Sequence, residues 1–208
     1  MAFDFLVSAF VTLFVVVDPL GLVPAFLALT QGMKARARRQ VAARAALIAA
    51  AILAGSALVG DWLLARLGIS LPAFRIAGGL LLFYVAFQMV LEQRVEEETS
   101  TAEHALEARA RHIAAFPLAI PLMAGPGAIT ATVLLAGQTR TEPVLLVLLL
   151  SVIAAISAIC LAVFLLAARI HRLFGATVNS VLSRLLGVVL AALAVQYVID
   201  GVRAMLKA

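Results

Sequence analysis

Residues 5–30 read FLVSAFVTLFVVVDPLGLVPAFLALT, an apolar run whose single charged side chain is Asp18. A helix needs about 20 apolar residues to cross a bilayer, so this run is long enough to span a membrane. Two prolines, Pro19 and Pro24, stand with Gly21 in its interior. A proline inside a helix removes a backbone donor and clashes with the carbonyl four residues earlier. The sequence therefore predicts a first transmembrane helix that is broken within the membrane.

The composition of the whole chain supports a membrane location. Of the 208 residues, 64% are hydrophobic and 13% are charged, whereas soluble domains are near half apolar and about a quarter charged. This excludes a soluble enzyme, and the single cysteine excludes a disulfide scaffold. Five further apolar runs are long enough to cross the bilayer: 41–60, 70–91, 113–138, 144–168 and 178–199. We predict an all-α membrane protein with six transmembrane helices in a single polytopic domain, residues 1–208.

The lysines and arginines are distributed unevenly between the two sides of such a six-span chain. Eleven lie on the side of the first, third and fifth loops and five on the other side, which here includes both termini. Cytoplasmic loops carry the excess of basic residues, so we expect these three loops in the cytoplasm and both termini outside. The eleven are Lys34, Arg36, Arg38, Arg39, Arg44, Arg94, Arg109, Arg111, Arg169, Arg172 and Arg184; the five are Arg66, Arg75, Arg140, Arg203 and Lys207.

The two halves of the chain share two sequence patterns. Residues 19–24 (PLGLVP) and 121–126 (PLMAGP) have a common Pro-Leu-x-x-x-Pro spacing. An arginine followed by a glycine and later a glutamine recurs in the third and sixth runs: Arg75, Gly78 and Gln88; Arg184, Gly187 and Gln196. Three spans per half force the halves into opposite orientations, as in the inverted repeats of secondary transporters. We expect repeat 1 at about 1–92, a charged cytoplasmic connector at about 93–112, and repeat 2 at about 113–208.

The broken helices predict a binding site. Asp18 followed by Pro19 resembles a helix N-cap and first helical residue, and the prolines and glycines of the fourth span could start a second half-helix. Such starts present free N–H groups and a partial positive charge, which suit the carboxylate of a small zwitterion. The alternative is that the prolines only kink the helices for packing. The predicted substrate-binding residues are Asp18, Pro19, Gly21, Pro24, Pro121, Gly125, Pro126, Gly127, Ala128 and Thr130.

Five polar side chains inside the spans are candidates for coupling or gating. Asp18 could bind a coupling proton or sodium ion, or meet a substrate ammonium, or it could be a plain helix cap. Arg75 and Arg184 lie about one turn inside their helices, where they either extend to the membrane interfaces or gate the cavity. Gln88 and Gln196 either hydrogen-bond between helices or line the pocket.

Residues 18–26 (DPLGLVPAF) and 117–130 (PLAIPLMAGPGAIT) closely resemble the motifs of the MarC family of bacterial inner-membrane proteins. Six spans and external termini are also similar to that family, and the resemblance covers nearly the whole chain. Members are grouped with small neutral amino-acid transporters, so the resemblance implies a substrate such as glycine or alanine. The expected function is secondary transport of such amino acids in the bacterial inner membrane. The alternatives are a channel or exporter of another small metabolite, or a non-transporting scaffold subunit.

An intramembrane enzyme is the competing class. All three histidines lie in loops between the predicted spans, so no span offers a serine–histidine or metal–histidine group. Asp18 has no second acidic residue deep in a span, and the sequence has no Gly-x-x-x-x-Gly-Lys phosphate-binding motif. We therefore expect no enzymatic activity, no cofactor, no metal site and no nucleic-acid partner. Any energy coupling is expected to come from a proton or sodium gradient.

Overall fold

The computed structural model describes residues 2–91, 114–139 and 142–206, and every regular element in them is a helix. The predicted all-α class is therefore confirmed for this part of the chain, whereas the predicted connector at about 93–112 lies outside it. The elements in chain order are α1 (Ala2–Val17), α2 (Leu22–Leu29), α3 (Ala35–Arg66), α4 (Leu71–Val90), η1 (Ala114–Met123), α6 (Pro126–Gly137) and α7 (Pro143–Leu206).

Four helical segments of the described residues are long and apolar enough to cross a membrane: α3, α4, and the segments Pro143–Arg169 and Ser180–Leu206 of α7. The pair α1 and α2, bent by 48° at the break, counts as a fifth if it is one span. The predicted number of six is not confirmed, because the fourth expected span is divided between η1 and α6. At 1.5 Å per residue, the 12 residues of α6 extend only about 18 Å, less than the hydrocarbon core.

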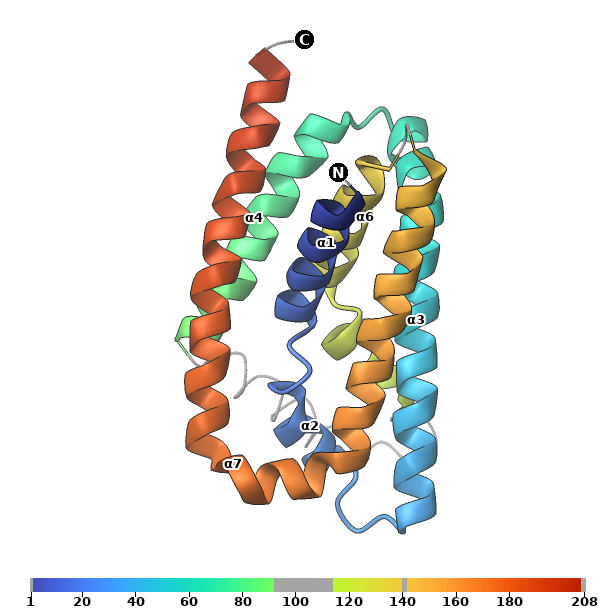
Figure 1. Ribbon diagram of the computed structural model, residues 1–208, viewed down its shortest axis with the longest axis vertical. Helices are drawn as coiled ribbons and strands as arrows, with labels where there is room; N and C mark the ends of the chain where they lie inside the picture. Colours follow the sequence, from blue (N-terminus) through green and yellow to red (C-terminus); the bar gives the residue numbers. More distant parts are fainter. Residues whose placement is uncertain (1, 92–113, 140–141, 207–208) are drawn as a thin grey trace.

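The last two predicted spans belong to one helix. Helix α7 is 64 residues long, and Figure 1 shows it running along the molecule, turning across its lower end and running back. We call Pro143–Arg169 its first arm and Ser180–Leu206 its second arm. The two predicted spans are present as these arms, and the predicted fifth loop between them is helical. Residues 169–178 contain one glycine and no proline, so nothing in them forces the helix to end.

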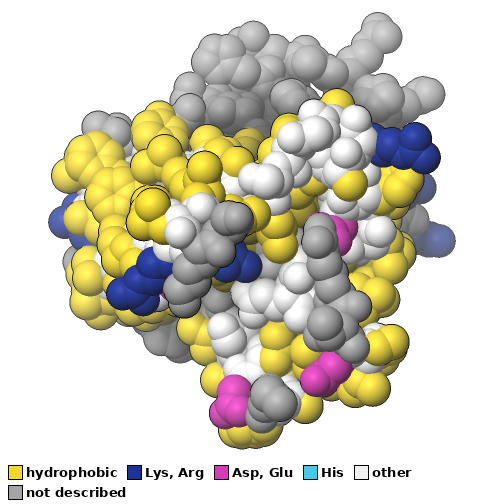
Figure 2. All heavy atoms as spheres, turned by 90° about the horizontal axis from the view of Figure 1, so that it is seen from above, with side chains coloured by type: hydrophobic (Ala, Val, Ile, Leu, Met, Phe, Trp, Pro, Cys, Tyr) yellow, Lys and Arg dark blue, Asp and Glu magenta, His cyan; other side chains and the backbone are white. Residues whose placement is uncertain are grey.

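The broken helices lie in the centre of the bundle. Figure 1 shows α1 and α6 between α4 with the second arm of α7 on one side and α3 with the first arm on the other, with both chain ends towards the upper end. In α6, Gly127, Ala128 and every residue from Thr130 to Ala136 are buried. Large hydrophobic side chains are exposed along the sides of the bundle, among them Leu47, Leu80 and Val147, and in the end view of Figure 2 hydrophobic side chains gather at the rim with scattered charged ones. Such an exterior fits contact with lipid.

Helix α4 and the second arm of α7 approach each other through glycines. A Cβ atom on Gly79 would lie 2.8 Å from the carbonyl oxygen of Ala194, and one on Gly187 would lie 3.1 Å from the carbonyl oxygen of Ala86. Distances this short leave no room for a larger residue, so the two backbones are in direct contact. Small residues allow this close packing between membrane helices, and it fixes the second arm of α7 beside α4.

Candidate functional site

The break between α1 and α2 is built around Asp18. Its φ angle of +48° lies in the left-handed region, and it is the one non-glycine residue with a positive φ among the described residues. Its N–H donates to the carbonyl of Phe14 at 3.0 Å, so the last turn of α1 closes at Asp18 and the chain then turns away. A left-handed residue after the last helical turn is a common way to end a helix, and aspartate tolerates this conformation better than most residues.

The carboxylate of Asp18 joins three parts of the chain. Its Oδ1 accepts the N–H of Gly21 at 3.1 Å, and its Oδ2 accepts the hydroxyl of Ser183 at 2.8 Å. Asp18 is 4% exposed and Ser183 is 5% exposed. The hydrogen bond to Ser183 links residues 165 positions apart in the sequence. It therefore ties the break to the second arm of α7.

Asp18 makes the hydrogen bonds predicted of a helix N-cap, with its side chain accepting the N–H of Gly21 and its carbonyl that of Leu22, but the regular helix α2 begins later than predicted. The N-cap of α2 is Gly21, which has a φ of −60° and receives no side-chain cap. Pro19 and Leu20 lie in the turn between Asp18 and this N-cap. The Asp18 side chain reaches forward over the turn and accepts the N–H of Gly21. One residue thus ends α1 and stabilises the turn that leads into α2.

Gly21 has no room for a side chain. A Cβ atom there would lie 2.7 Å from Cγ of Asp18 and 3.1 Å from Oγ of Ser183. The carboxylate and the hydroxyl therefore occupy the space that any other residue type would fill. The predicted importance of Gly21 has a definite cause, which is close packing around the Asp18–Ser183 hydrogen bond.

Both arms of α7 hold the break. The rings of Phe26 in α2 and Phe164 in the first arm are stacked, with centroids 4.5 Å apart, while Ser183 in the second arm holds Asp18. Both rings are buried, and a stacked aromatic pair adds about 0.5–1.5 kcal/mol beyond its buried area. The break is consequently fixed from two sides by a single helix.

The second predicted break is also present. Helix η1 ends at Met123, the N–H of Ala124 donates to the carbonyl of Ala119 at 2.9 Å, and α6 begins at Pro126. Gly125 is the N-cap, with φ −75° and ψ 172°, and no side chain caps it. Helices leave their first N–H groups without intrahelical partners, so the start of α6 offers the N–H groups of Gly127 and Ala128. Pro121 lies in the backbone of η1.

The two breaks are close together. A Cβ atom on Gly127 would lie 3.5 Å from Cγ1 of Val16, two residues before Asp18, and 3.4 Å from side-chain atoms of Leu82 and Val85. Gly127 therefore borders packed side chains of α1 and α4. Its surroundings accept one added methyl group at ordinary contact distance, and a leucine would overfill them.

The remaining predicted site residues are arranged around these breaks in different ways. Pro24 is half-buried in the first turn of α2. Thr130 is buried, and its methyl group contacts the position where Gly78 of α4 would carry a Cβ atom. This contact assigns part of the Thr130 side chain to helix packing. The parts of the site that could bind a charged ligand are therefore the Asp18 turn, which carries a carboxylate, and the start of α6, whose first N–H groups have no intrahelical partner.

The coupling candidates outside the breaks are not brought together. The Gln88 amide donates to the hydroxyl of Tyr84 at 3.1 Å, and the Gln196 amide donates to Asp200 at 2.9 Å, each on its own helix and in an exposed position. Arg184 is exposed, whereas Arg75 is partly buried in α4. Of the two glutamines and two arginines, Arg75 has a buried side-chain nitrogen without a hydrogen-bond partner among the described residues.

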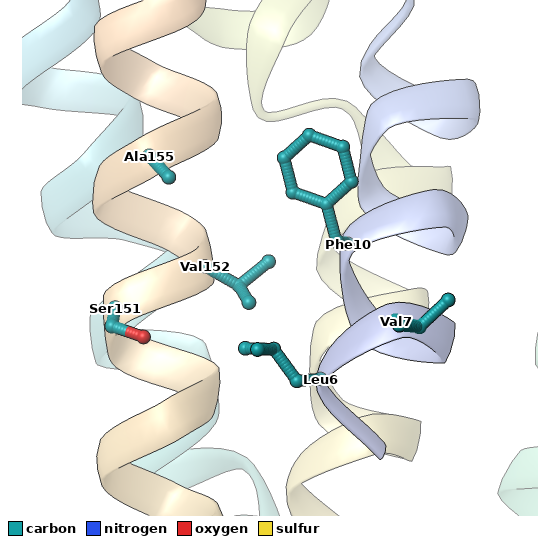
Figure 3. Close-up of a pocket in the computed structure, with 6 residues that line it drawn as sticks. All are labelled: Leu6, Val7, Phe10, Ser151, Val152 and Ala155. Carbon is teal, nitrogen blue, oxygen red and sulfur yellow. The ribbon is translucent and has the colours of Figure 1, made fainter. Parts of the chain in front are cut away.

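A groove elsewhere on the protein is unsuited to a zwitterion. It has a volume of about 280 Å³ and is lined by Leu6, Val7 and Phe10 of α1 and by Ser151, Val152 and Ala155 of α7 (Figure 3). The Ser151 hydroxyl donates to the carbonyl of Leu148 at 2.7 Å, so its proton is already used. A charged ligand placed there would lose its hydration without gaining hydrogen-bond partners. The apolar lining of the groove is suited to a hydrocarbon chain instead.

Ser183 is the site residue that sequence reasoning missed. It is a small polar residue next to Arg184 in an apolar run, which is a weak signal, because serine is common where membrane helices pack. Its partner is 165 residues away, and no local pattern relates the two positions. The contact depends on how the second arm of α7 is placed.

Replacing Ser183 by alanine is expected to destabilise the protein by about 1.5–3 kcal/mol, because one oxygen of a buried carboxylate loses its donor. Thermal unfolding of the purified variant in detergent measures this loss. Ser151→Ala is the matched control, since its hydroxyl bonds to its own helix on an exposed face, and it should unfold like the wild type. Equal unfolding temperatures for both variants would contradict the role of Ser183.

Comparison with known proteins identifies the family. A protein-family model described as "MarC family integral membrane protein" matches residues 3–206. The chain belongs to the MarC family. This confirms the resemblance carried by residues 18–26 and 117–130, and it shows that the chain is an integral membrane protein. This MarC family chain therefore lies in a bilayer.

Relatives cover almost the full chain in both bacteria and archaea. The UPF0056 membrane protein YhcE of Escherichia coli is 34% identical over 203 residues, 97% of this chain and 94% of its own length. YvbG of Bacillus subtilis is 34% identical over 207 residues, covering 99% and 97%. A UPF0056 membrane protein of Archaeoglobus fulgidus is 37% identical over 199 residues, covering 95% and 92%. None of these names states a substrate, and no solved structure matches the chain.

Proposed function

We propose that this MarC family protein is a secondary transporter of small neutral amino acids such as glycine or alanine, with the substrate held between the two broken helices. The observation that carries the proposal is the buried carboxylate of Asp18, held at the α1–α2 break by Gly21 and Ser183. Ionisable groups inside a membrane are costly and mark substrate or ion pathways. Secondary transporters place their sites at such interrupted helices.

The two breaks offer opposite charges to a zwitterion. The start of α6 presents N–H groups and the positive end of a helix dipole, which favour a carboxylate. Asp18 supplies a negative charge for an ammonium group or for a coupling proton or sodium ion. Cγ1 of Val16 lies 3.5 Å from the position of a Cβ atom on Gly127, so the two breaks are close together, and a substrate held between them would have to be small.

Proteoliposomes containing the purified protein test the function directly. We expect saturable uptake of labelled glycine, alanine or serine, stimulated by a proton or sodium gradient, and counterflow when the unlabelled amino acid is trapped inside. Counterflow separates a carrier from a channel, which gives flux without exchange. Absence of flux for all three amino acids under both gradients would refute the proposal.

The proposal includes six crossings in two inverted repeats, with both termini on the periplasmic side of the inner membrane. Support comes from the course of the chain in Figure 1, where α1, α3, α4, α6 and the two arms of α7 run roughly along the long axis. The basic first turns of α3, with Arg36, Arg38 and Arg39, lie at the end opposite the chain termini. An excess of basic residues favours the cytoplasm.

Reporter fusions test this orientation. Alkaline phosphatase, which is active only outside the cytoplasm, should be active when fused after Lys207 and inactive when inserted within residues 96–103. Green fluorescent protein should give the reverse result at the same two positions. A fluorescent C-terminal fusion would place the C-terminus inside and contradict the orientation.

A further inference from the structure

Arg75 occupies an interior position on α4 that the proposed substrate site does not use. Leu71 and Gly78 on the same helix contact α6, whereas Pro72 and Gly79 contact the second arm of α7. With 3.6 residues per turn, residue 75 lies on the face between these two contact stripes. Its side chain is therefore directed into the bundle between α6 and α7.

The guanidinium of Arg75 has an unused donor in this interior. Its Nε atom is buried and has no hydrogen-bond partner among the described residues. A guanidinium stays charged and presents its N–H groups in a planar fork, and a buried charged donor without a partner is costly. Asp200 on the neighbouring arm already accepts the amide of Gln196 at 2.9 Å. The Nε atom of Arg75 itself has no acceptor among the described residues and is open to an anionic ligand.

Two buried hydroxyls lie in the same region. Tyr197 in the second arm of α7 stands between Ala194 and Val198, the two residues packed against Gly79 of α4, and it lies near Thr12 of α1 and within electrostatic range of Arg75. Tyr197 is 9% exposed and Thr12 is 1% exposed. Thr12 precedes Asp18 by six residues, about 9 Å along the α1 axis, so these groups lie on the N-terminal side of the break.

We infer that Arg75, Tyr197 and Thr12 form a second binding site, specific for a small carboxylate, between the chain-terminus end of the bundle and the break at Asp18. The fork of Arg75 would hold both carboxylate oxygens, which is the strongest common recognition of this group, and the hydroxyls would complete the site. The identity of the ligand as an amino-acid substrate rests on the proposed function. The carboxylate specificity does not.

Equilibrium dialysis of the purified protein in detergent tests the site with two labelled probes, acetate and glycine. Acetate carries the carboxylate alone, so its binding is independent of any amino-acid transport. Arg75→Lys keeps the charge but loses the planar fork, and we expect at least about a tenfold rise in the acetate Kd. Tyr197→Phe keeps the buried ring and should raise the Kd by about fivefold, as expected for the loss of one hydrogen bond. Arg203→Lys, an exposed change on α7, should leave it within about twofold.

Each outcome of the binding experiment either supports or overturns the carboxylate site. Acetate binding by the wild type that is weakened in Arg75→Lys and Tyr197→Phe supports the site. Wild-type protein that binds no acetate, or Arg75→Lys protein that binds acetate with an unchanged Kd, overturns it even if glycine is transported. Acetate binding that depends on Arg75, in a protein that neither binds nor transports amino acids, supports the site and refutes the proposed function. Unfolding temperatures of the variants show whether a loss of binding reflects a loss of fold.

Discussion

Replacing Gly21 by alanine is expected to abolish amino-acid uptake and to destabilise the protein by about 2 kcal/mol or more. The added Cβ atom would lie 2.7 Å from Cγ of Asp18 and 3.1 Å from Oγ of Ser183. Extra methyl groups in a packed interior typically cost about 1–3 kcal/mol, and here the methyl would also displace the carboxylate from both of its donors. Uptake in proteoliposomes and thermal unfolding in detergent measure the two effects.

The matched control for this change is Gly55→Ala. Gly55 lies within α3, and a Cβ atom there would have nothing within 4 Å. Alanine favours a helix over glycine by up to about 1 kcal/mol, so this variant should unfold no earlier than the wild type and transport normally. If Gly21→Ala transported at the wild-type rate, the close packing around the Asp18 carboxylate would have no functional role.

The sequence predicted the breaks because their chemistry is local. Proline and glycine act on the backbone within a few residues, and so residues 18–24 and 121–127 were sufficient to place both interruptions. The capping hydrogen bonds of Asp18 were predicted, but the start of regular helix at Leu22 was not. An Asp-Pro pair is compatible with a helix N-cap, and the left-handed conformation of Asp18 is set by the turn to Gly21 and by Ser183.

Long-range features of the site could not be derived from sequence patterns. Hydropathy treats residues 144–199 as two spans with a loop, although 169–178 continue the helix, because hydropathy measures polarity and gives no information on helix ends. Ser183, which donates to Asp18, and the residues packed against Gly79 lie on α7, as does Tyr197 near Arg75. Their contacts follow from how this bent helix packs around the broken ones, which is a property of the tertiary structure.

Replacing Asp18 by asparagine is expected to uncouple transport from the gradient while preserving substrate exchange. Asparagine tolerates the left-handed conformation, and its carbonyl oxygen can still accept the N–H of Gly21. It cannot carry the negative charge that binds a proton or cation. At one-to-one coupling a tenfold gradient supports about tenfold accumulation, equivalent to about 1.4 kcal/mol. Accumulation in the asparagine variant should therefore fall to about the external concentration, while counterflow continues.

Asp18→Ala separates the charge from the structural role of the side chain. Alanine loses both acceptor oxygens, leaves the Ser183 hydroxyl and the Gly21 N–H without partners, and tolerates a φ of +48° poorly. It should therefore unfold at a lower temperature than the asparagine variant, by an amount corresponding to at least about 1 kcal/mol. Accumulation by Asp18→Asn with unchanged proton and sodium dependence would restrict Asp18 to this structural role. The coupling charge would then have to lie on another residue.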